Sequence, residues 1–384
     1  MGSGIFTQDG AAWKHSRDLL RPQFASNRYQ NFEEIKNCVK SLIGQIPKDD
    51  AIDLQPLFFR LTFDSTTFLL FGETTSSLQS AEIAGQESEF VDAFNLGQGY
   101  LTTHSFVDAA VQRALDAADG KKEQAAGEKQ RYVFIDALVQ QTREKKVLRD
   151  QCLNVLLAGR DTTACCLTWT MQVNTVATDV LSTLRSEIQS IIGLGPNAAR
   201  PTREDLKRMT YLNIVIKEVL RLYPSVPVNS RAAVRRTTLP VGGGPDGQSS
   251  VLVRKGEAVG YCVYAMHRRK DIYGPDAYKF RPERWEGDAL RDVGYGYLPF
   301  NGGPRVCLGQ DFAISNFPTF QGPASSAVRK SSFSRCCHND HLPGSTCTDT
   351  LKLAKPFISA SALQTCPHPR SSRRHDELFF LERG

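Results

Sequence analysis

The longest uninterrupted helical stretch lies near the middle of the chain and constrains the fold more than any other feature. Residues 147–176 contain no proline and one glycine, Gly159, and their apolar side chains recur at helical spacing. These thirty residues would extend over about 45 Å as a helix, whereas a compact chain of this length has a radius of gyration of about 21 Å. Such a helix crosses most of the molecule, so we expect it at the centre of a mainly α-helical fold.

Helix breakers and residue propensities place the other elements. Helices are predicted over residues 11–46 with an interruption at Pro22, over 53–72 between Asp53 and Gly72, and over 203–222. Two segments rich in β-branched residues, 226–238 and 250–263, predict short strands or a hairpin. Loops are expected at 73–89 and 117–131, and a structured meander rich in proline, glycine and aromatic residues at 271–306.

Charge and hydropathy exclude two classes of protein. The chain carries 47 Lys and Arg against 41 Asp and Glu, which gives a net charge of +6. This surplus is small and evenly spread, so we expect no nucleic acid partner. No apolar run reaches the roughly 18 residues that a membrane-spanning helix needs.

The ten cysteines fall into three groups. Five lie in apolar or helical contexts, and we interpret them as buried free thiols in a reducing compartment: Cys38, Cys152, Cys165, Cys166 and Cys262. Four lie within residues 317–384, where no periodicity is sustained and we predict an unrelated, disordered tail: Cys336, Cys337, Cys347 and Cys366. A zinc site built on Cys336-Cys337-His338 and His341 is an alternative there, although the spacing matches no common tetrahedral arrangement. The tenth is Cys307.

Two glycine-rich strings are candidate sites. Residues 242–247 match G-x-G-x-x-G, but a strand rather than a helix follows them, so we interpret them as a hairpin loop. Residues 300–309 have the form F-x-x-G-x-R-x-C-x-G. Its glycines permit a tight turn that surrounds the Cys307 sulfur with backbone N–H groups, an arrangement suited to a metal. Taken alone, a buried structural cysteine in a turn is an equal alternative.

The string at 300–309 resembles the haem-binding loop of the cytochromes P-450, and further marks of that family follow in the expected order. Residues 158–163 match its oxygen-activation motif, 218–221 its E-x-x-R helix and 280–285 its P-E-R segment. Trp13 and Arg17, which share a helix face, resemble its W-x-x-x-R pair. The resemblance covers residues 1–316 and implies a partial haem domain with the family's multi-helical fold and small β-sheets, incomplete at both ends.

The resemblance implies a role for individual residues. Cys307 is the expected axial ligand of the haem iron, and its thiolate pushes electron density toward O–O cleavage. Asp161 and Thr162 are the expected catalytic pair for proton delivery, and Thr162 can bond back to the carbonyl of Ala158 on the same helix face. The other expected haem contacts are Trp13, Arg17, Ala158, Arg231, Phe300, Gly303, Arg305 and Gly309. A buried triad is expected to be structural rather than catalytic: Glu218, Arg221 and Arg284.

The resemblance also implies an activity. The strings at 231–247, 264–271 and 298–300 look most like the fungal microsomal branch that hydroxylates n-alkanes and fatty acids. We therefore expect a haem-thiolate monooxygenase that acts on a long-chain aliphatic substrate with O₂. Its electrons would come from an NADPH-cytochrome P-450 reductase, since no flavin or nicotinamide site is evident. A truncated, catalytically inactive haem-protein remnant is the alternative hypothesis.

The sequence departs from the family at three places. It starts at the propionate-facing helix, without the anchor that holds the family on the endoplasmic reticulum membrane, so we expect a cytosolic or peripheral chain. The segment 97–103 looks shortened where the family carries its substrate-lid helices. After Asn316 the family pattern is lost, and our hypothesis is a misread intron or a frameshift.

Overall fold

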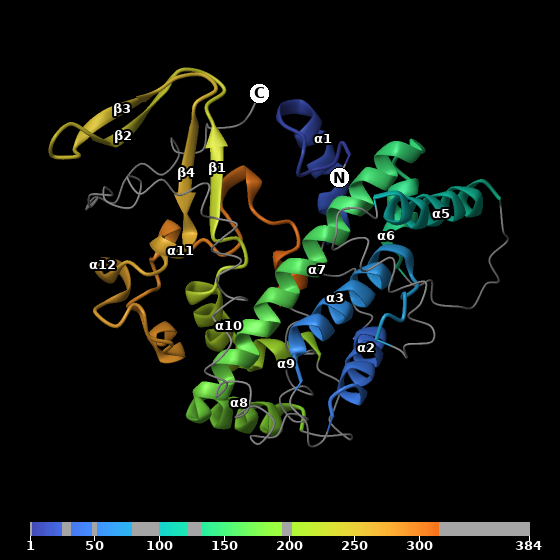
Figure 1. The fold of residues 1–384 in the computed structure, drawn as a ribbon, viewed down its shortest axis with the longest axis horizontal. Helices are drawn as coiled ribbons and strands as arrows, with labels where there is room; N and C mark the ends of the chain where they lie inside the picture. The colour runs from blue at the N-terminus through green and yellow to red at the C-terminus, as the bar shows by residue number, and fades with distance from the viewer. Residues whose placement is uncertain are drawn as a thin grey trace.

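One helix runs through the middle of the structure, and the other elements are arranged around it (Figure 1). The computed structural model describes residues 2–24, 32–47, 52–78, 100–120, 132–193 and 202–314. The central helix is α7, Lys145–Val176, with 32 residues. The predicted central helix is therefore confirmed, with a start two residues earlier than expected.

Helix α3, Leu54–Phe71, packs along α7 and has the predicted ends. The Asp53 side chain accepts a hydrogen bond from the N–H of Gln55 at 2.9 Å, and Gly72 ends the helix in the left-handed region with a φ of 77°. A Cβ atom at Gly159 of α7 would lie 2.7 Å from the Thr66 hydroxyl oxygen of α3. The single glycine of α7 is thus what allows the two helices to approach so closely.

The predicted interruption at Pro22 is confirmed, and one other helix prediction needs correction. The segment 11–46 contains α1 (Gly10–Leu20), a 3₁₀ turn η1 (Arg21–Phe24) and α2 (Phe32–Gly44), so the interruption at Pro22 separates distinct helices. The single helix predicted over 203–222 is wrong: α9 (Arg203–Arg208) and α10 (Thr210–Leu222) are separated at Met209, whose ψ of 70° is not helical. The side chains of Thr202 and Asp205 start α9 as a capping box.

The remaining helices surround α7. They are α5 (Tyr100–Asp119), α6 (Phe134–Val139) and α8 (Thr178–Ile191). The loop predicted from residue 117 is corrected, because α5 continues to Asp119. Residues 73–78 form the predicted loop after α3, while 79–89, 97–99 and 121–131 lie outside the described residues.

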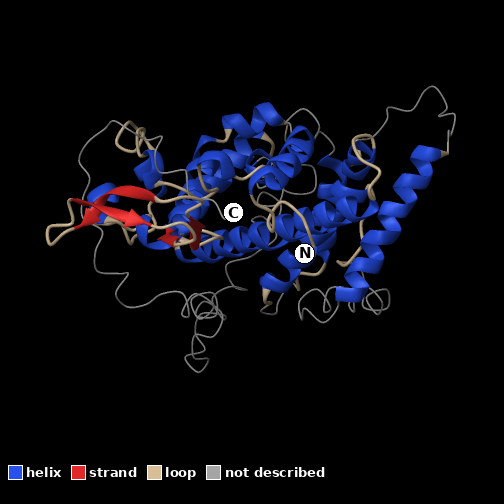
Figure 2. Cartoon of the chain, turned by 90° about the horizontal axis from the view of Figure 1, so that it is seen from above, coloured by secondary structure: helices blue, strands red, loops and turns tan. Residues whose placement is uncertain are grey.

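The predicted β segments form two small antiparallel sheets. Strand β1 (Val228–Ala232) pairs with β4 (Ala258–Cys262), and β2 (Thr237–Gly243) pairs with β3 (Ser249–Val253). The turn between β2 and β3 is closed by a 2.8 Å hydrogen bond from the N–H of Gly242 to the carbonyl of Gly247. The glycine-rich string is therefore a hairpin loop, as predicted. Figure 2 shows the strands together at one end of the structure, with helices over the rest.

The meander after the strands consists of short helical turns. These are α11 (Val263–Met266), α12 (Lys270–Tyr273), η2 (Pro282–Trp285), η3 (Gly294–Gly296) and η4 (Gly303–Arg305). The predicted structured meander is confirmed. The last turn, η4, belongs to the loop that carries Cys307.

Two apolar clusters form the core, and α7 contributes to both. The C-terminal half of α7 packs with α2, α3, α8 and α10, and its N-terminal half packs with α1, α3, α5 and α6. Between them, residues 157–163 of α7 are half-buried or exposed, with the exception of Arg160. The centre of the longest helix is therefore less buried than the turns on either side that pack in the two clusters.

Several predictions are answered only for the part of the chain that the structure describes. Cys38, Cys152 and Cys166 are buried as expected, but Cys165 and Cys262 are only half-buried. No described helix is both long and apolar enough to cross a bilayer. Asn316, the tail at 317–384 and its cysteine and histidine residues lie outside the described residues.

Candidate functional site

The loop at residues 300–309 holds Cys307 by its own backbone. The N–H of Cys307 donates a 2.9 Å hydrogen bond to the carbonyl of Phe300, which closes the loop. Asn301 and Gly303 both have a φ of 64°, a left-handed conformation that asparagine and glycine tolerate best. The Asn301 side chain accepts hydrogen bonds from the Gly302 N–H at 3.0 Å and from the Tyr261 hydroxyl at 2.9 Å. The loop is thereby fixed from strand β4.

Cys307 is exposed, whereas Val306 and Leu308 beside it are half-buried. Protein nevertheless surrounds the sulfur closely enough that burial raises the pKa of the thiol. A hydrogen bond from the backbone of Gly309 and the positive charge of Arg17 act on this pKa in the opposite direction. Cys307 thus combines an accessible sulfur with partners that favour its thiolate form.

Helix α1 brings Trp13 and Arg17 to this loop, which itself carries Arg305. Arg17 donates to the carbonyl of Val306 at 3.0 Å, although 289 positions separate the two residues. The guanidinium groups of Arg17 and Arg305 lie 5.7 and 4.3 Å from the ring centre of Trp13, which is 8% exposed. Arg305 also pairs with Asp9 at 2.8 Å. The structure therefore places Trp13, Arg17 and Arg305 together beside Cys307.

Arg231 approaches the loop from strand β1. Its guanidinium donates to the Asn229 side chain at 3.0 Å and lies 5.9 Å from the centre of the Tyr261 ring. Because the Tyr261 hydroxyl bonds Asn301, Arg231 is linked to the Cys307 loop through one side chain.

The accessible turn of α7 carries the predicted proton-delivery residues. The Thr162 hydroxyl donates to the carbonyl of Ala158 at 2.7 Å, which confirms the predicted bond, and the helix continues unbroken through this turn. The Asp161 carboxylate pairs with Arg160 at 3.1 Å. Burial raises the pKa of Asp161, and the charge of Arg160 opposes that shift. Ser225, after α10, donates to the carbonyl of Thr162 at 3.0 Å.

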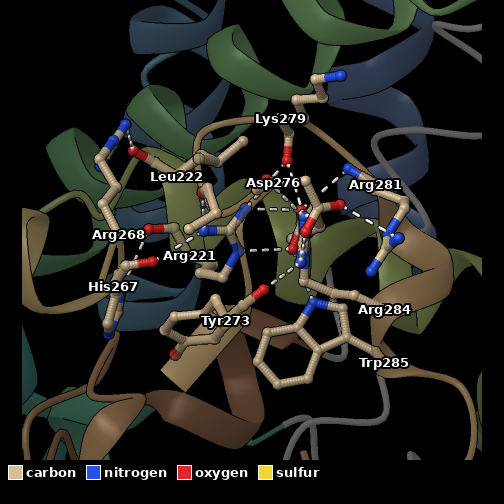
Figure 3. Close-up of polar contacts among 12 residues, drawn as sticks. Arg221, Leu222, His267, Arg268, Tyr273, Asp276, Lys279, Arg281, Arg284 and Trp285 are labelled. Carbon is tan, nitrogen blue, oxygen red and sulfur yellow. Dashed lines mark hydrogen bonds and ion pairs between the residues drawn. The ribbon is translucent and has the colours of Figure 1, made fainter. Parts of the chain in front are cut away.

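The expected structural triad is present and buried. Figure 3 labels its two arginine residues, Arg221 and Arg284. Arg221 contacts the two oxygens of Glu218 through Nε and Nη2, both at 2.8 Å, and Arg284 Nε contacts Glu218 at 2.8 Å. Glu218 also accepts from the Trp285 indole at 3.0 Å and from the N–H of Arg281 at 2.9 Å. The two guanidinium groups extend to backbone carbonyls of the meander, so the triad ties α10 to the segment that leads to Cys307.

A second set of positioning contacts was not predicted from the sequence. Buried Gln151 of α7 donates to the hydroxyl of Ser16 at 2.7 Å, and Ser16 donates to the side chain of Gln8. The carbonyl of Gln8 in turn accepts from Arg305 at 3.2 Å. These contacts join the central helix, α1 and the Cys307 loop. A polar residue at position 151, on a helix that must be buried, was the available signal.

A family model described as Cytochrome P-450 matches residues 1–320. The chain belongs to the cytochrome P-450 family. It is 63% identical over 336 residues to a cytochrome P-450 of Arthroderma benhamiae, a match that covers 82% of this chain and 67% of that protein. It is 45% identical to Cytochrome P-450 52A5 of Candida maltosa and 43% identical to Cytochrome P-450 52A1 of Candida tropicalis, with 66% and 64% of those proteins covered. The chain thus spans about two thirds of the length of these relatives.

The solved structures agree on the fold. The crystal structure of a cytochrome P-450, CYP102L1, matches with a TM-score of 0.71 at 20% identity, over 85% of this chain and 78% of that one. The mainly helical P-450 fold with small sheets is therefore confirmed.

Haem, as iron protoporphyrin IX, is the cofactor of this family, and the residues present here suit it. An accessible cysteine is a donor for haem iron. Arg17 and Arg305 lie beside it, and guanidinium groups pair with carboxylates such as those of haem through charge-assisted hydrogen bonds.

Proposed function

We propose that residues 1–316 form a haem domain in which Cys307 is the axial ligand of the iron. The observation that carries this proposal is the contact of Arg17 with Val306, which brings α1 against the Cys307 loop across 289 positions of sequence. Phe300, Gly303 and Gly309 would shape the loop against the haem. The residues proposed to face the haem propionates are Trp13, Arg17, Arg231 and Arg305.

The proposed reaction is the insertion of one oxygen atom of O₂ into a C–H bond. Thiolate-ligated haem supplies the activation of O₂. Asp161 and Thr162 would deliver protons from the half-buried turn of α7, with Ala158 on the same helix face. The pairing of Asp161 with Arg160 supports this role, because it holds the carboxylate at a turn that the two core clusters leave open.

The proposed substrate is a long-chain alkane or fatty acid, with electrons from an NADPH-cytochrome P-450 reductase. The resemblance of residues 231–247, 264–271 and 298–300 to the n-alkane and fatty-acid hydroxylase branch supports this substrate class.

The direct test is a spectrum of the reduced protein with carbon monoxide. The full chain is produced with haem, reduced and exposed to CO, and we expect the long-wavelength Soret band that is typical of thiolate-ligated iron. Cys307→Ala should lose that band. Addition of a long-chain fatty acid should then perturb the Soret band of the oxidised protein, and a short-chain acid should not.

The same experiment addresses the inactive-remnant hypothesis. A sample that takes up no haem, or one whose spectrum is unchanged by Cys307→Ala, would contradict the proposal. A normal spectrum without product, when reductase, NADPH and substrate are supplied, would favour an inactive haem protein.

A further inference from the structure

His267 lies fully buried between helix α10 and the approach to the Cys307 loop. Its Nδ1 is 3.1 Å from the carbonyl oxygen of Arg221, at the end of α10. Its Nε2 accepts a 2.8 Å hydrogen bond from the N–H of Leu298. The ring stacks on Tyr297, with ring centres 5.2 Å apart. Both nitrogens and one ring face are therefore engaged.

The two partners fix the protonation of the ring. A backbone N–H can only donate, so Nε2 must carry a lone pair toward Leu298. A carbonyl oxygen can only accept, so the single proton must be on Nδ1, facing Arg221. The neutral Nδ1–H tautomer is thus the form that satisfies both contacts, and its two ends are not interchangeable.

The contact with α10 is reciprocal. Arg221 of the buried triad donates from Nη1 to the carbonyl of His267 at 2.8 Å, while the His267 ring bonds the Arg221 carbonyl. The neighbouring Arg268 bonds the next carbonyl, that of Leu222 (Figure 3). The last carbonyls of α10 have no partner within their helix, so this pair of residues satisfies them. His267 is therefore rigidly attached to α10.

The other end of the ring reaches the cysteine loop within a few residues. Leu298 is followed by Pro299 and by Phe300, whose carbonyl accepts the N–H of Cys307 at 2.9 Å. Two hydrogen bonds and a three-residue segment therefore connect the His267 ring to the backbone of the cysteine. Displacement of Leu298 would be transmitted to the position of the sulfur.

We propose that His267 is a positioning residue, which sets the Cys307 loop relative to α10 through its hydrogen bond to Leu298. The effect on the haem thiolate rests on the proposed function, whereas the positioning of Leu298 does not. His267 touches neither the haem nor the substrate in this proposal.

Two amide variants separate the two ends of the ring. In His267→Gln the terminal oxygen can occupy the place of Nε2 and still accept from Leu298, but the donor to Arg221 is lost. In His267→Asn the shorter amide can still donate to Arg221, but it does not reach Leu298. The core variant Leu184→Ala, at a fully buried position of α8, is the control for general loss of stability.

The first measurement is amide hydrogen exchange at Leu298 and Cys307 in the full chain. His267→Asn should accelerate exchange at Leu298 by about tenfold or more, and His267→Gln should leave most of the protection in place. In the control Leu184→Ala, hydrogen exchange at Leu298 should not speed up more than exchange at other buried amides. Because this readout requires no bound haem, it decides the positioning role even if the proposed function fails.

The second measurement is the CO spectrum of the haem-loaded protein. His267→Asn should shift population from the long-wavelength to the short-wavelength Soret form at neutral pH. His267→Gln and the control should resemble the wild type. Equal behaviour of the Asn and Gln variants in hydrogen exchange would overturn the proposal, as would unchanged exchange at Leu298 in both.

Discussion

Neutralising Glu218 tests how strongly the buried triad holds the fold. In Glu218→Gln the volume is retained, but the negative charge is lost between Arg221 and Arg284, whose side chains are 0% and 2% exposed. One carboxylate oxygen also becomes an NH₂ group, which then faces the donors of Arg221, Arg284 or Trp285. The variant therefore leaves the buried charge of Arg221 without a carboxylate partner. It also turns an amide N–H donor toward other donors.

The expected loss of unfolding free energy is about 3–5 kcal/mol, the range for breaking a buried ion pair from one side. The other partners do not remove this penalty. Arg284 keeps Asp276 at 3.3 Å, but Arg221 keeps only backbone carbonyls, among them those of His267 and Ala277 at 2.8 and 2.6 Å. At about 2 °C per kcal/mol for a large domain, the melting temperature should fall by about 6–10 °C.

The matched control is Glu204→Gln on α9. Glu204 and Lys207 have the same i, i+3 spacing as Glu218 and Arg221 and the same 2.8 Å contact, but their side chains are 77% and 64% exposed. Its cost should stay below about 1 kcal/mol. Thermal melts followed by circular dichroism would compare the two variants at one pH and salt concentration. Equal melting temperatures would refute the argument that burial gives this triad its strength.

Three further predictions concern single contacts. Gly159→Ala should destabilise the protein by about 1–3 kcal/mol in urea unfolding, since its Cβ would lie 2.7 Å from the Thr66 oxygen, and the double variant with Thr66→Ala should recover part of that loss. Asp53→Ala should cost about 1 kcal/mol by melting, with Asp53→Asn close to wild type, and equal losses would contradict a capping role. Burial, with the charges of Arg221 and Arg268, lowers the pKa of His267 from 6.5 to about 4. The unfolded state therefore binds the proton more tightly than the folded state does. The free energy of unfolding should be highest above about pH 6.5 and should fall by about 3 kcal/mol as the pH drops through 4. Urea unfolding of His267→Gln should not show this loss.

Local patterns predicted what depends on local physics. Asp53 and Gly72 were identified as the ends of α3 because capping and a left-handed C-terminal residue involve only neighbours in sequence. The length of α7 followed from the lack of breakers. The break at Met209 was not predicted, because no glycine or proline marks it and apolar periodicity continues on both sides.

Contacts across the fold were accessible only through the resemblance, or not at all. The pairing of Arg17 with Val306 cannot be deduced from spacing, and the family motifs alone suggested that these segments meet. His267 lies within the family-like string at 264–271, and no sequence pattern there indicates a role for it. Its two hydrogen bonds connect positions 46 and 31 residues away, and nothing in the local sequence specifies their direction.

The buried charges explain how the meander before Cys307 holds one conformation. Its elements are turns of three or four residues, too short to be stable by their own hydrogen bonds. Arg221 and Arg284 both donate to the carbonyl of Lys279 at 3.1 Å, and Arg284 donates to that of Tyr273 at 3.0 Å. An apolar cluster of the same volume would be no less stable, but it would fix no carbonyl in direction. Directional contacts therefore fix a segment of short turns that apolar packing would leave free to shift. Arg221 also connects the triad to His267, whose ring bonds the segment that leads to Cys307.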